Sequence, residues 1–324
     1  MRFHTNISYS FRKTLRTLLM LVCGILFSLT VRGQQDPLYS QYLNNLATIN
    51  PAYVGVQESM NIKLLTRHQW TGFEGAPTTS TLAFTMPYQD NQMGFGGRIV
   101  YDGYGPVTQL GVYGDYAYHL DINPRRGRYL SFGISAGFNL FYADILGIGE
   151  NQDDPAFIAD MSNKFLPNVG IGIMYRDRDY LIGVSVPKLI ENQVSVKDIS
   201  RTSINKDMLH IYLLGAYKFK LDRDIVMKLA TTVRYIRSTN IAADLHAFVT
   251  FYNNFTGGIM YRTGNSFGMS MQYDIREGIR LGYAYDMTSL EDTYSFPSTH
   301  ELMLSYDIPS NKRRRYRRKS DYFF

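Results

Sequence analysis

Residues 130–142 read Leu-Ser-Phe-Gly-Ile-Ser-Ala-Gly-Phe-Asn-Leu-Phe-Tyr, and this stretch decides the fold class. From Leu130 to Leu140 every second residue is apolar, whereas the residues between them are serine, glycine or asparagine. Successive side chains of a β-strand point to opposite faces. The stretch therefore predicts a strand with one apolar face and one small, polar face.

The same alternation recurs at similar length in thirteen further segments of the chain, although it is weaker in 61–70, 79–87, 94–102 and 255–262. They are residues 61–70, 79–87, 94–102, 110–118, 169–175, 180–186, 209–219, 227–235, 245–251, 255–262, 267–273, 279–285 and 302–308. Lipid offers no hydrogen bonds, so a sheet inside a membrane must close on itself. We therefore expect an all-β fold, a transmembrane antiparallel β-barrel of about fourteen strands.

The connections between these segments alternate in length. Those expected at one end are uniformly short: residues 88–92, 121–128, 176–179, 221–224, 252–254 and 275–278. Those expected at the other end include every long loop: residues 71–78, 103–107, 143–167, 188–206, 237–241, 263–265 and 287–299. Short periplasmic turns and longer outer loops are typical of outer-membrane barrels.

The composition agrees with a barrel and excludes a bundle of membrane helices. The chain has 26 Tyr, 19 Phe and 27 Gly, and 19% of its residues are charged, which is below the usual quarter. The mean hydropathy of -0.21 is too low for helical spans. Barrel strands are apolar on one side only, so they are compatible with that value.

The N-terminus has the features of an export signal. Basic residues precede an apolar stretch, residues 18–31, which is too short to span a bilayer comfortably as a helix. We expect residues 1–33 to be a signal peptide cleaved after Gly33; the alternative is a membrane anchor. Cys23, the only cysteine, lies in the apolar stretch. The mature chain would then have no disulfide, no cysteine-based metal site and no thiol nucleophile.

The charge of the chain is concentrated at its two ends. The formal net charge is +6. The segment 1–33 holds five basic and no acidic residues, which leaves +1 for the mature chain. Residues 312–319 alone contribute seven positive charges. The barrel body is therefore mildly acidic, and the composition does not indicate a nucleic-acid partner.

Residues 34–59 lack the strand alternation and carry motifs instead. They contain Asp36-Pro37, Tyr39-Ser40-Gln41-Tyr42 and Ile49-Asn50-Pro51-Ala52-Tyr53-Val54-Gly55. Further motifs are Arg67-His68-Gln69-Trp70-Thr71-Gly72-Phe73-Glu74-Gly75-Ala76-Pro77-Thr78-Thr79, Gly94-Phe95-Gly96-Gly97 leading to Asp102 and Gly105-Pro106, and His300-Glu301-Leu302-Met303-Leu304-Ser305-Tyr306. Together these motifs resemble the PorP/SprF family of type IX secretion system membrane proteins. The basic tail after Pro309 departs from that pattern.

The resemblance implies a non-enzymatic role in the cell outer membrane. Some members of the family help to export or retain surface adhesins used in gliding motility, and others link the membrane to periplasmic, peptidoglycan-associated subunits. The residues themselves leave alternatives open. One is a channel for small or hydrophobic solutes with an N-terminal plug; another is an enzyme on the barrel rim, although no paired nucleophile and base is present. No cofactor or metal site is expected.

The resemblance and the residues together divide the chain. Residues 34–59 are expected to plug the barrel or to cap its periplasmic mouth, residues 60–309 to form the barrel, and residues 310–324 to be a periplasmic tail. The alternative for residues 34–59 is a flexible leader. The tail would bind an acidic partner, contact anionic lipid or remain solvated.

Candidate residues for the plug or for partner binding follow from this division. They are Tyr39, Tyr42, Asn50, Pro51 and Tyr53 in the plug, Trp70, Phe73 and Glu74 in a loop, and Arg313, Arg314, Arg315, Arg317 and Arg318 in the tail. The loop would constrict the lumen, contact a partner or form a simple hairpin. A further set on the polar strand faces is expected to line the lumen as ion pairs or, less readily, as a selectivity filter: Lys228, Arg234, Asp244, His246, Arg280 and Asp286.

Overall fold

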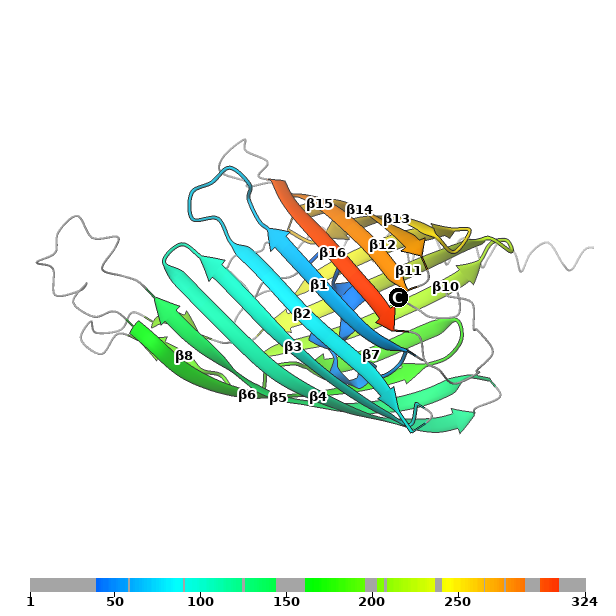
Figure 1. Cartoon of the computed structure of the whole chain (residues 1–324), viewed down its shortest axis with the longest axis horizontal. Helices are drawn as coiled ribbons and strands as arrows, with labels where there is room; N and C mark the ends of the chain where they lie inside the picture. Colours follow the sequence, from blue (N-terminus) through cyan, green and yellow to red (C-terminus); the bar gives the residue numbers. More distant parts are fainter. Residues whose placement is uncertain are drawn as a thin grey trace, which may run out of the picture.

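The chain forms a closed β-barrel in the computed structural model (Figure 1). The structure describes residues 39–57, 59–89, 91–123, 126–143, 161–195, 203–206, 209–236, 241–264, 266–276, 278–288 and 298–308. The predicted signal peptide and the basic tail lie outside these residues. Within them, no helix is long and apolar enough to cross a membrane.

Fourteen strands of the described chain make up the barrel, and all neighbours are antiparallel. They are β1 (Met60–His68), β2 (Thr78–Tyr88), β3 (Met93–Tyr104), β4 (Val107–Asn123), β5 (Arg128–Ala143), β6 (Met161–Arg176), β7 (Tyr180–Val186), β10 (His210–Lys220), β11 (Ile225–Ile236), β12 (Ala242–Phe251), β13 (Phe255–Arg262), β14 (Ser266–Arg276), β15 (Ile279–Thr288) and β16 (Ser298–Ile308). β1 pairs with β16 and closes the barrel. The prediction of an all-β, closed antiparallel barrel of about fourteen strands is confirmed.

The two ends of the barrel differ as the connections predicted. The turns β2–β3, β4–β5, β6–β7, β10–β11, β12–β13 and β14–β15 are short and share one end, which we call the short-turn end. Every long connection lies at the opposite, long-loop end. One such connection contains a separate two-stranded sheet of β8 (Gln193–Ser195) and β9 (Ser203–Lys206), which the sequence did not predict.

The largest error in a predicted strand boundary concerns β6. Residues 143–167 were expected to form a loop, but β6 begins at Met161. Its first residues contain Lys164 and Pro167 and do not alternate clearly, so their strand signal is weak. They are held in register by the neighbouring strand, for example through the pairs Leu140↔Phe165 and Phe138↔Pro167. Tertiary pairing overrides local pattern here.

The two faces of the wall have the predicted characters. On β5, Phe132 and Ile134 are 44% and 58% exposed, whereas Ser131 and Ser135 are buried. The outward face is therefore large and apolar, as a lipid-facing surface requires. The inward face carries serine, asparagine and charged side chains, which need partners inside the barrel.

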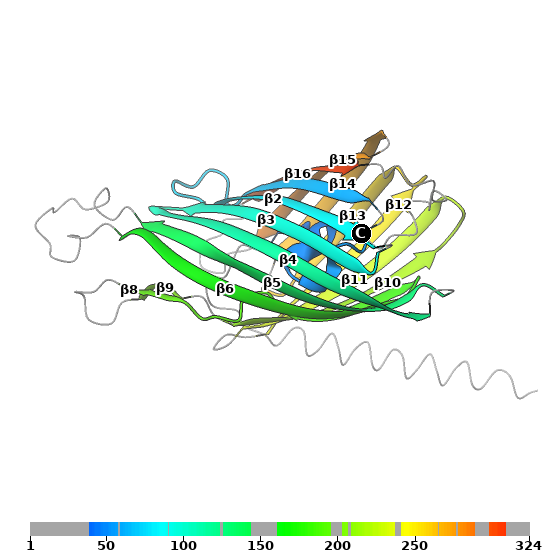
Figure 2. The ribbon, with the colours of Figure 1, turned by 60° about the horizontal axis from the view of Figure 1, so that its bottom comes forward.

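Residues 39–57, which we call the lumen segment, lie inside the barrel (Figures 1 and 2, blue). The segment contains two short 3-10 helices, η1 (Tyr42–Thr48) and η2 (Pro51–Tyr53). Asn50 caps η2 by accepting a hydrogen bond from the Ala52 N–H, and Pro51 occupies the first position, where its fixed φ suits a helix start. The local sequence thus explains why this segment coils instead of extending.

Candidate functional site in the barrel lumen

A buried carboxylate holds the start of the lumen segment. The backbone N–H groups of Ser40 and Gln41 donate to the two carboxylate oxygens of Glu301, at 2.6 and 3.0 Å. Arg67 also donates to Glu301 and forms an ion pair with Asp286 at 3.4 Å. Buried charges are tolerated only when they are paired and hydrogen-bonded. Glu301 therefore ties the segment to a charge network that spans β1, β15 and β16.

Two tyrosine hydroxyl groups connect the segment to opposite sides of the wall. Tyr39 is hydrogen-bonded to Thr81 at 2.6 Å, and Tyr42 to the Nε2 atom of His246 at 3.1 Å. The Tyr42 ring also meets the His246 ring edge-on, with centroids 5.3 Å apart. Burial raises the pKa of Tyr42 well above its ordinary value, so its hydroxyl group stays neutral. Both tyrosines were candidate anchor residues.

Wall side chains also satisfy carbonyl groups along the segment. Lys63 donates to the Asn44 carbonyl, and the Ser185 hydroxyl donates to the Ile49 carbonyl at 2.7 Å. His119 donates from Nε2 to the Val54 carbonyl at 2.9 Å, and its Nδ1 atom lies 2.7 Å from the Ser131 hydroxyl. A segment without sheet partners needs such bonds, because buried backbone groups are costly when unpaired.

Glycines in the wall make room for the second half of the segment. A Cβ atom at Gly133 would lie 2.1 Å from the Ala52 nitrogen, and one at Gly172 would lie 2.1 Å from Asn50 Oδ1. At Gly94 it would lie 2.0 Å from the Val54 carbonyl oxygen. We call Gly94, Gly133 and Gly172 the glycine notch. Any side chain at these positions would overlap the segment.

The notch brings together motifs that are far apart in the sequence. The Asn50-to-Gly55 motif lies against Gly94, which belongs to the Gly94-Phe95-Gly96-Gly97 motif. Gly55 has φ of 75°, in the region that favours glycine, and a Cβ there would lie 2.4 Å from the Gly94 Cα atom. The motif that ends at Gly55 and the motif that begins at Gly94 therefore pack against each other.

The other candidate residues lie elsewhere. Tyr53 and Pro51 are buried in the lumen segment. Trp70, Phe73 and Glu74 lie in the exposed β1–β2 loop at the long-loop end, and Phe73 is 53% exposed. That loop is fastened to the rim, since the Thr71 N–H donates to the Ser298 carbonyl at 2.8 Å. The five tail arginines lie outside the described residues.

Charged residues of the inward face form ion pairs. Asp244 lies 2.9 Å from Arg262 and 3.7 Å from Arg234, and Asp274 lies 3.0 Å from Arg280. Sequence reasoning did not single out several partners that matter: Glu301, Arg67, His119, and the Arg98–Asp115 pair at 2.6 Å. Each of these residues is a polar residue at a strand position whose side chain points into the barrel. Such a position predicts which face the side chain lies on, but it does not predict which residue it binds.

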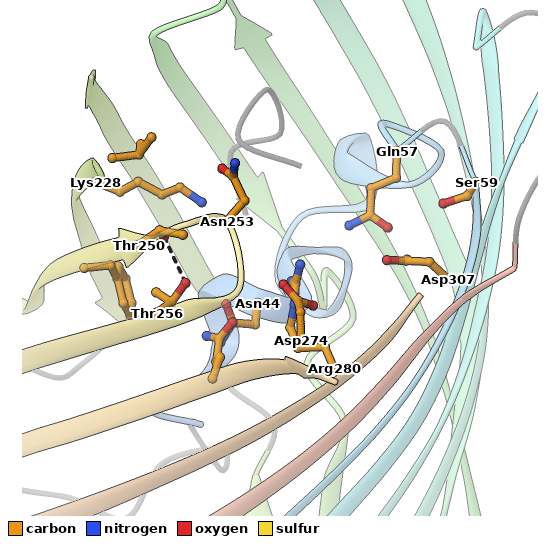
Figure 3. A pocket seen from close by; sticks show the side chains of 13 residues that line it. Asn44, Gln57, Ser59, Lys228, Thr250, Asn253, Thr256, Asp274, Arg280 and Asp307 are labelled. Atoms are coloured by element: carbon orange, nitrogen blue, oxygen red, sulfur yellow. Dashed lines mark hydrogen bonds and ion pairs between the residues drawn. The ribbon is translucent and has the colours of Figure 1, made fainter. Parts of the chain in front are cut away.

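Two cavities flank the lumen segment. A polar cavity of about 70 Å³ lies toward the short-turn end, where Asn44 of the segment faces Lys228, Thr250, Asp274 and Arg280 (Figure 3). A larger cavity of about 130 Å³ lies toward the long-loop end. Among the residues that the structure describes, no group of three His, Cys, Asp or Glu side chains is arranged to hold a metal ion.

Comparison with known proteins yields one family and several similar folds. The family model described as type IX secretion system membrane protein PorP/SprF matches residues 31–306. The comparison with curated proteins gives no match.

Among solved structures, the CymD monoaromatic hydrocarbon channel has a TM-score of 0.51 at 11% identity, covering 85% of this chain and 94% of CymD. The TodX deltaS2S3 mutant monoaromatic hydrocarbon channel also has 0.51 at 11%, covering 87% and 97%. The outer-membrane protein Omp33 of Acinetobacter baumannii has 0.47 at 13%, covering 78% and 100%.

Proposed function

Because this chain belongs to the PorP/SprF family of type IX secretion system membrane proteins, we propose that it serves this system as a non-enzymatic docking component of the outer membrane. In this role it helps to export and anchor surface adhesins, or it links the membrane to periplasmic subunits of the machine. The short-turn end, where β1 begins and β16 ends, faces the periplasm, as in other outer-membrane barrels. The long loops face the exterior.

The observation that carries this proposal is the occupied lumen. The lumen segment acts as a plug, held by Glu301 at its start and by the glycine notch at its end. Its buried apolar residues, Leu43 and Leu46 among them, would be exposed to water if it left. A barrel filled in this way offers its rims and ends for recognition, which favours docking over the passage of solute.

The alternative function is a channel for small or hydrophobic solutes in which the lumen segment is a regulated plug. The observation that favours it is the fold that the chain shares with CymD and TodX, which are described as monoaromatic hydrocarbon channels. The cavity of about 130 Å³ on the long-loop side is also large enough for a small ring. A channel requires the segment to move, and docking does not.

The basic tail is the proposed contact for a periplasmic partner. Its seven positive charges at residues 312–319 follow directly after the last strand, at the periplasmic end. An acidic protein surface near the peptidoglycan is the partner that this charge would attract.

Affinity purification from native outer membranes, followed by mass spectrometry, tests the proposal. We expect large adhesins or subunits of the secretion machine to co-purify with the tagged protein. A tail in which residues 312–319 carry Gln in place of Lys and Arg, with its length kept, should lose the periplasmic partners and retain those bound outside. Recovery of the barrel alone, under conditions that preserve other membrane complexes, would contradict the docking role and favour the channel.

A further inference from the structure

The ladder of the barrel wall is interrupted between β6 and β10. β7 has seven residues, whereas β6 has sixteen. β7 pairs with β6 only from Arg176↔Leu181 to Ile171↔Val186. Within the described chain, residues 161–170 of β6 therefore have a strand partner on one side only. We call the part of the wall between these residues and the start of β10 the seam.

A loop fills the seam, and side chains bind it to β6. The Asn168 amide donates from Nδ2 to the Ile190 carbonyl at 2.9 Å and accepts from the Ile190 N–H at 3.2 Å. The Leu189 N–H donates to the Val169 carbonyl at 2.8 Å. Pro167 has no N–H to satisfy, a common protection for a strand edge. Side-chain amides thus take the place of a strand ladder in residues 187–192.

The seam lies in the half of the wall that faces the outer leaflet. Residues 165–169 of β6 pair with residues 136–140 of β5, and both runs are nearer the long-loop end. Leu189 and Ile190 are 36% and 41% exposed, so the described chain covers the apolar side chains of the loop only in part. A loop with few ladder bonds opens more easily than a paired strand.

A cavity lies directly behind this loop. Pro187 and Lys188 of the loop line the cavity of about 130 Å³, together with Tyr212 of β10. On the other side the cavity is lined by Tyr39 and Tyr113. At the seam, residues 187–192 are therefore the part of the described chain that lies between this cavity and the edge of β6.

The lining of the cavity indicates the ligand. Its size is close to that of a cavity of about 150 Å³ that accommodates a benzene ring. Tyrosine rings provide flat apolar surfaces, and Asn139 and Gln109 provide amide groups. The Nδ2 atom of Asn139 is buried and has no hydrogen-bond partner within the described chain. A ring with hydroxyl substituents would stack on the tyrosines and accept a hydrogen bond from this amide.

We propose that this cavity binds a hydroxylated six-membered ring, as in a sugar, and that the ring enters laterally from the outer leaflet through the seam. This site is independent of the secretion role. The ring belongs either to the headgroup of a membrane glycolipid, which takes this lateral route, or to a free sugar, which would reach the same cavity from the long-loop end. In the first case the acyl chains stay in the membrane while the headgroup passes between the loop and β10.

Cysteine labelling tests the route, because the mature chain is expected to have no cysteine of its own. In Cys23→Ser protein reconstituted in vesicles, Val100→Cys places a thiol in the cavity, and Thr250→Cys places one in the polar cavity at the other end. A maleimide attached to a lipid acyl chain should label Val100→Cys and leave Thr250→Cys unmodified. If Val100→Cys also stays unmodified, the lateral route is refuted.

The hydrogen bonds that attach the loop to β6 provide a second test of the route. Asn168→Ala removes both bonds to Ile190, and should increase the lipid-borne labelling rate of Val100→Cys by about fivefold to tenfold. Asn168→Asp, which loses only the donor, should give a smaller increase and is the fallback if the alanine variant folds poorly. The matched control is Ser305→Ala, on a strand paired on both sides. Equal rates in Asn168→Ala and the control would overturn the role of the loop.

Protection from labelling identifies the ligand and its source. In vesicles of phosphatidylethanolamine and phosphatidylglycerol, a small water-soluble maleimide should label Val100→Cys. Adding lipopolysaccharide to the vesicles should slow this reaction if the ring belongs to a glycolipid. Free glucosamine in solution should slow it if the ring is that of a soluble sugar. No protection by either would refute the ring site, and this result would leave the proposed secretion role untouched.

Discussion

The two halves of the lumen segment are held in different ways. Residues 39–46 are held by hydrogen bonds to polar side chains of the wall: Glu301 accepts from two backbone N–H groups, and His246 is hydrogen-bonded to Tyr42. Residues 49–56 are fixed mainly by shape, because the glycine notch admits the backbone where any Cβ would overlap it. The first half therefore depends on polar side chains of the wall, whereas the second half also requires three wall positions that carry no side chain.

The largest expected effect is at the notch. Gly133→Ala places a Cβ 2.1 Å from the Ala52 nitrogen, and we expect it to weaken docking of the segment by about 3 kcal/mol. Limited proteolysis of the folded barrel should then cleave within residues 39–57. Gly114→Ala is the matched control, because its nearest neighbour would be 4.0 Å away. Equal resistance of the two variants to protease would mean that shape does not hold this half.

The second-largest effect on docking of the lumen segment is expected at the Glu301 carboxylate. Glu301→Gln keeps one acceptor for the segment but removes the charge that pairs with Arg67, and should weaken docking by about 2 kcal/mol. Hydrogen exchange at the Ser40 and Gln41 amides should accelerate accordingly. Asp115→Asn, which breaks a buried pair within the wall, is the control and should leave these amides protected. Unchanged exchange in Glu301→Gln would contradict the chemical anchoring of the first half.

A smaller effect depends on pH. Burial raises the pKa of Tyr39 and Tyr42, so the docked hydroxyls stay neutral, while undocked tyrosines ionise near pH 10. Docking stability is thus fully present below about pH 10 and falls as pH rises above it. Tyr42→Phe should cost about 1 kcal/mol at neutral pH and reduce this alkaline loss. Protease sensitivity between pH 8 and pH 11 measures both; an identical profile in wild type and variant would exclude Tyr42 as a contributor.

The smallest effect is expected in the exposed β1–β2 loop. Phe73→Ala should change docking of the lumen segment by less than about 0.5 kcal/mol, because the side chain lies at the rim. Its effect should appear in the recovery of external partners from native membranes. Increased protease sensitivity of residues 39–57 in this variant would show that the loop supports the plug after all.

The strands were predictable because their signal is local. In residues 130–142 the alternation of apolar and polar side chains predicts the strand and its two faces without any knowledge of distant residues. The start of β6 was missed because Lys164 and Pro167 obscure the pattern, and only pairing with β5 defines the strand. The β8–β9 sheet was missed because its strands are too short to alternate visibly.

The site was predictable in part. The motif from Asn50 to Gly55 marked the segment, but the sequence could not show that it lies against Gly94, Gly133 and Gly172. Glycine on the small face of a strand looks the same whether it meets water or a close backbone. The His119 bond to the Val54 carbonyl joins residues 65 positions apart. Contacts between a side chain and a distant backbone carbonyl leave no periodic trace in the sequence.

Ion conductance in planar lipid bilayers tests whether the lumen segment closes the barrel. The intact protein should be silent, and a variant with residues 39–57 replaced by a short Gly-Ser linker should form stable open channels. Gly133→Ala should open intermittently, with Gly114→Ala silent as the intact protein. Steady conductance of the intact protein, equal to that of the variant without the segment, would contradict the account.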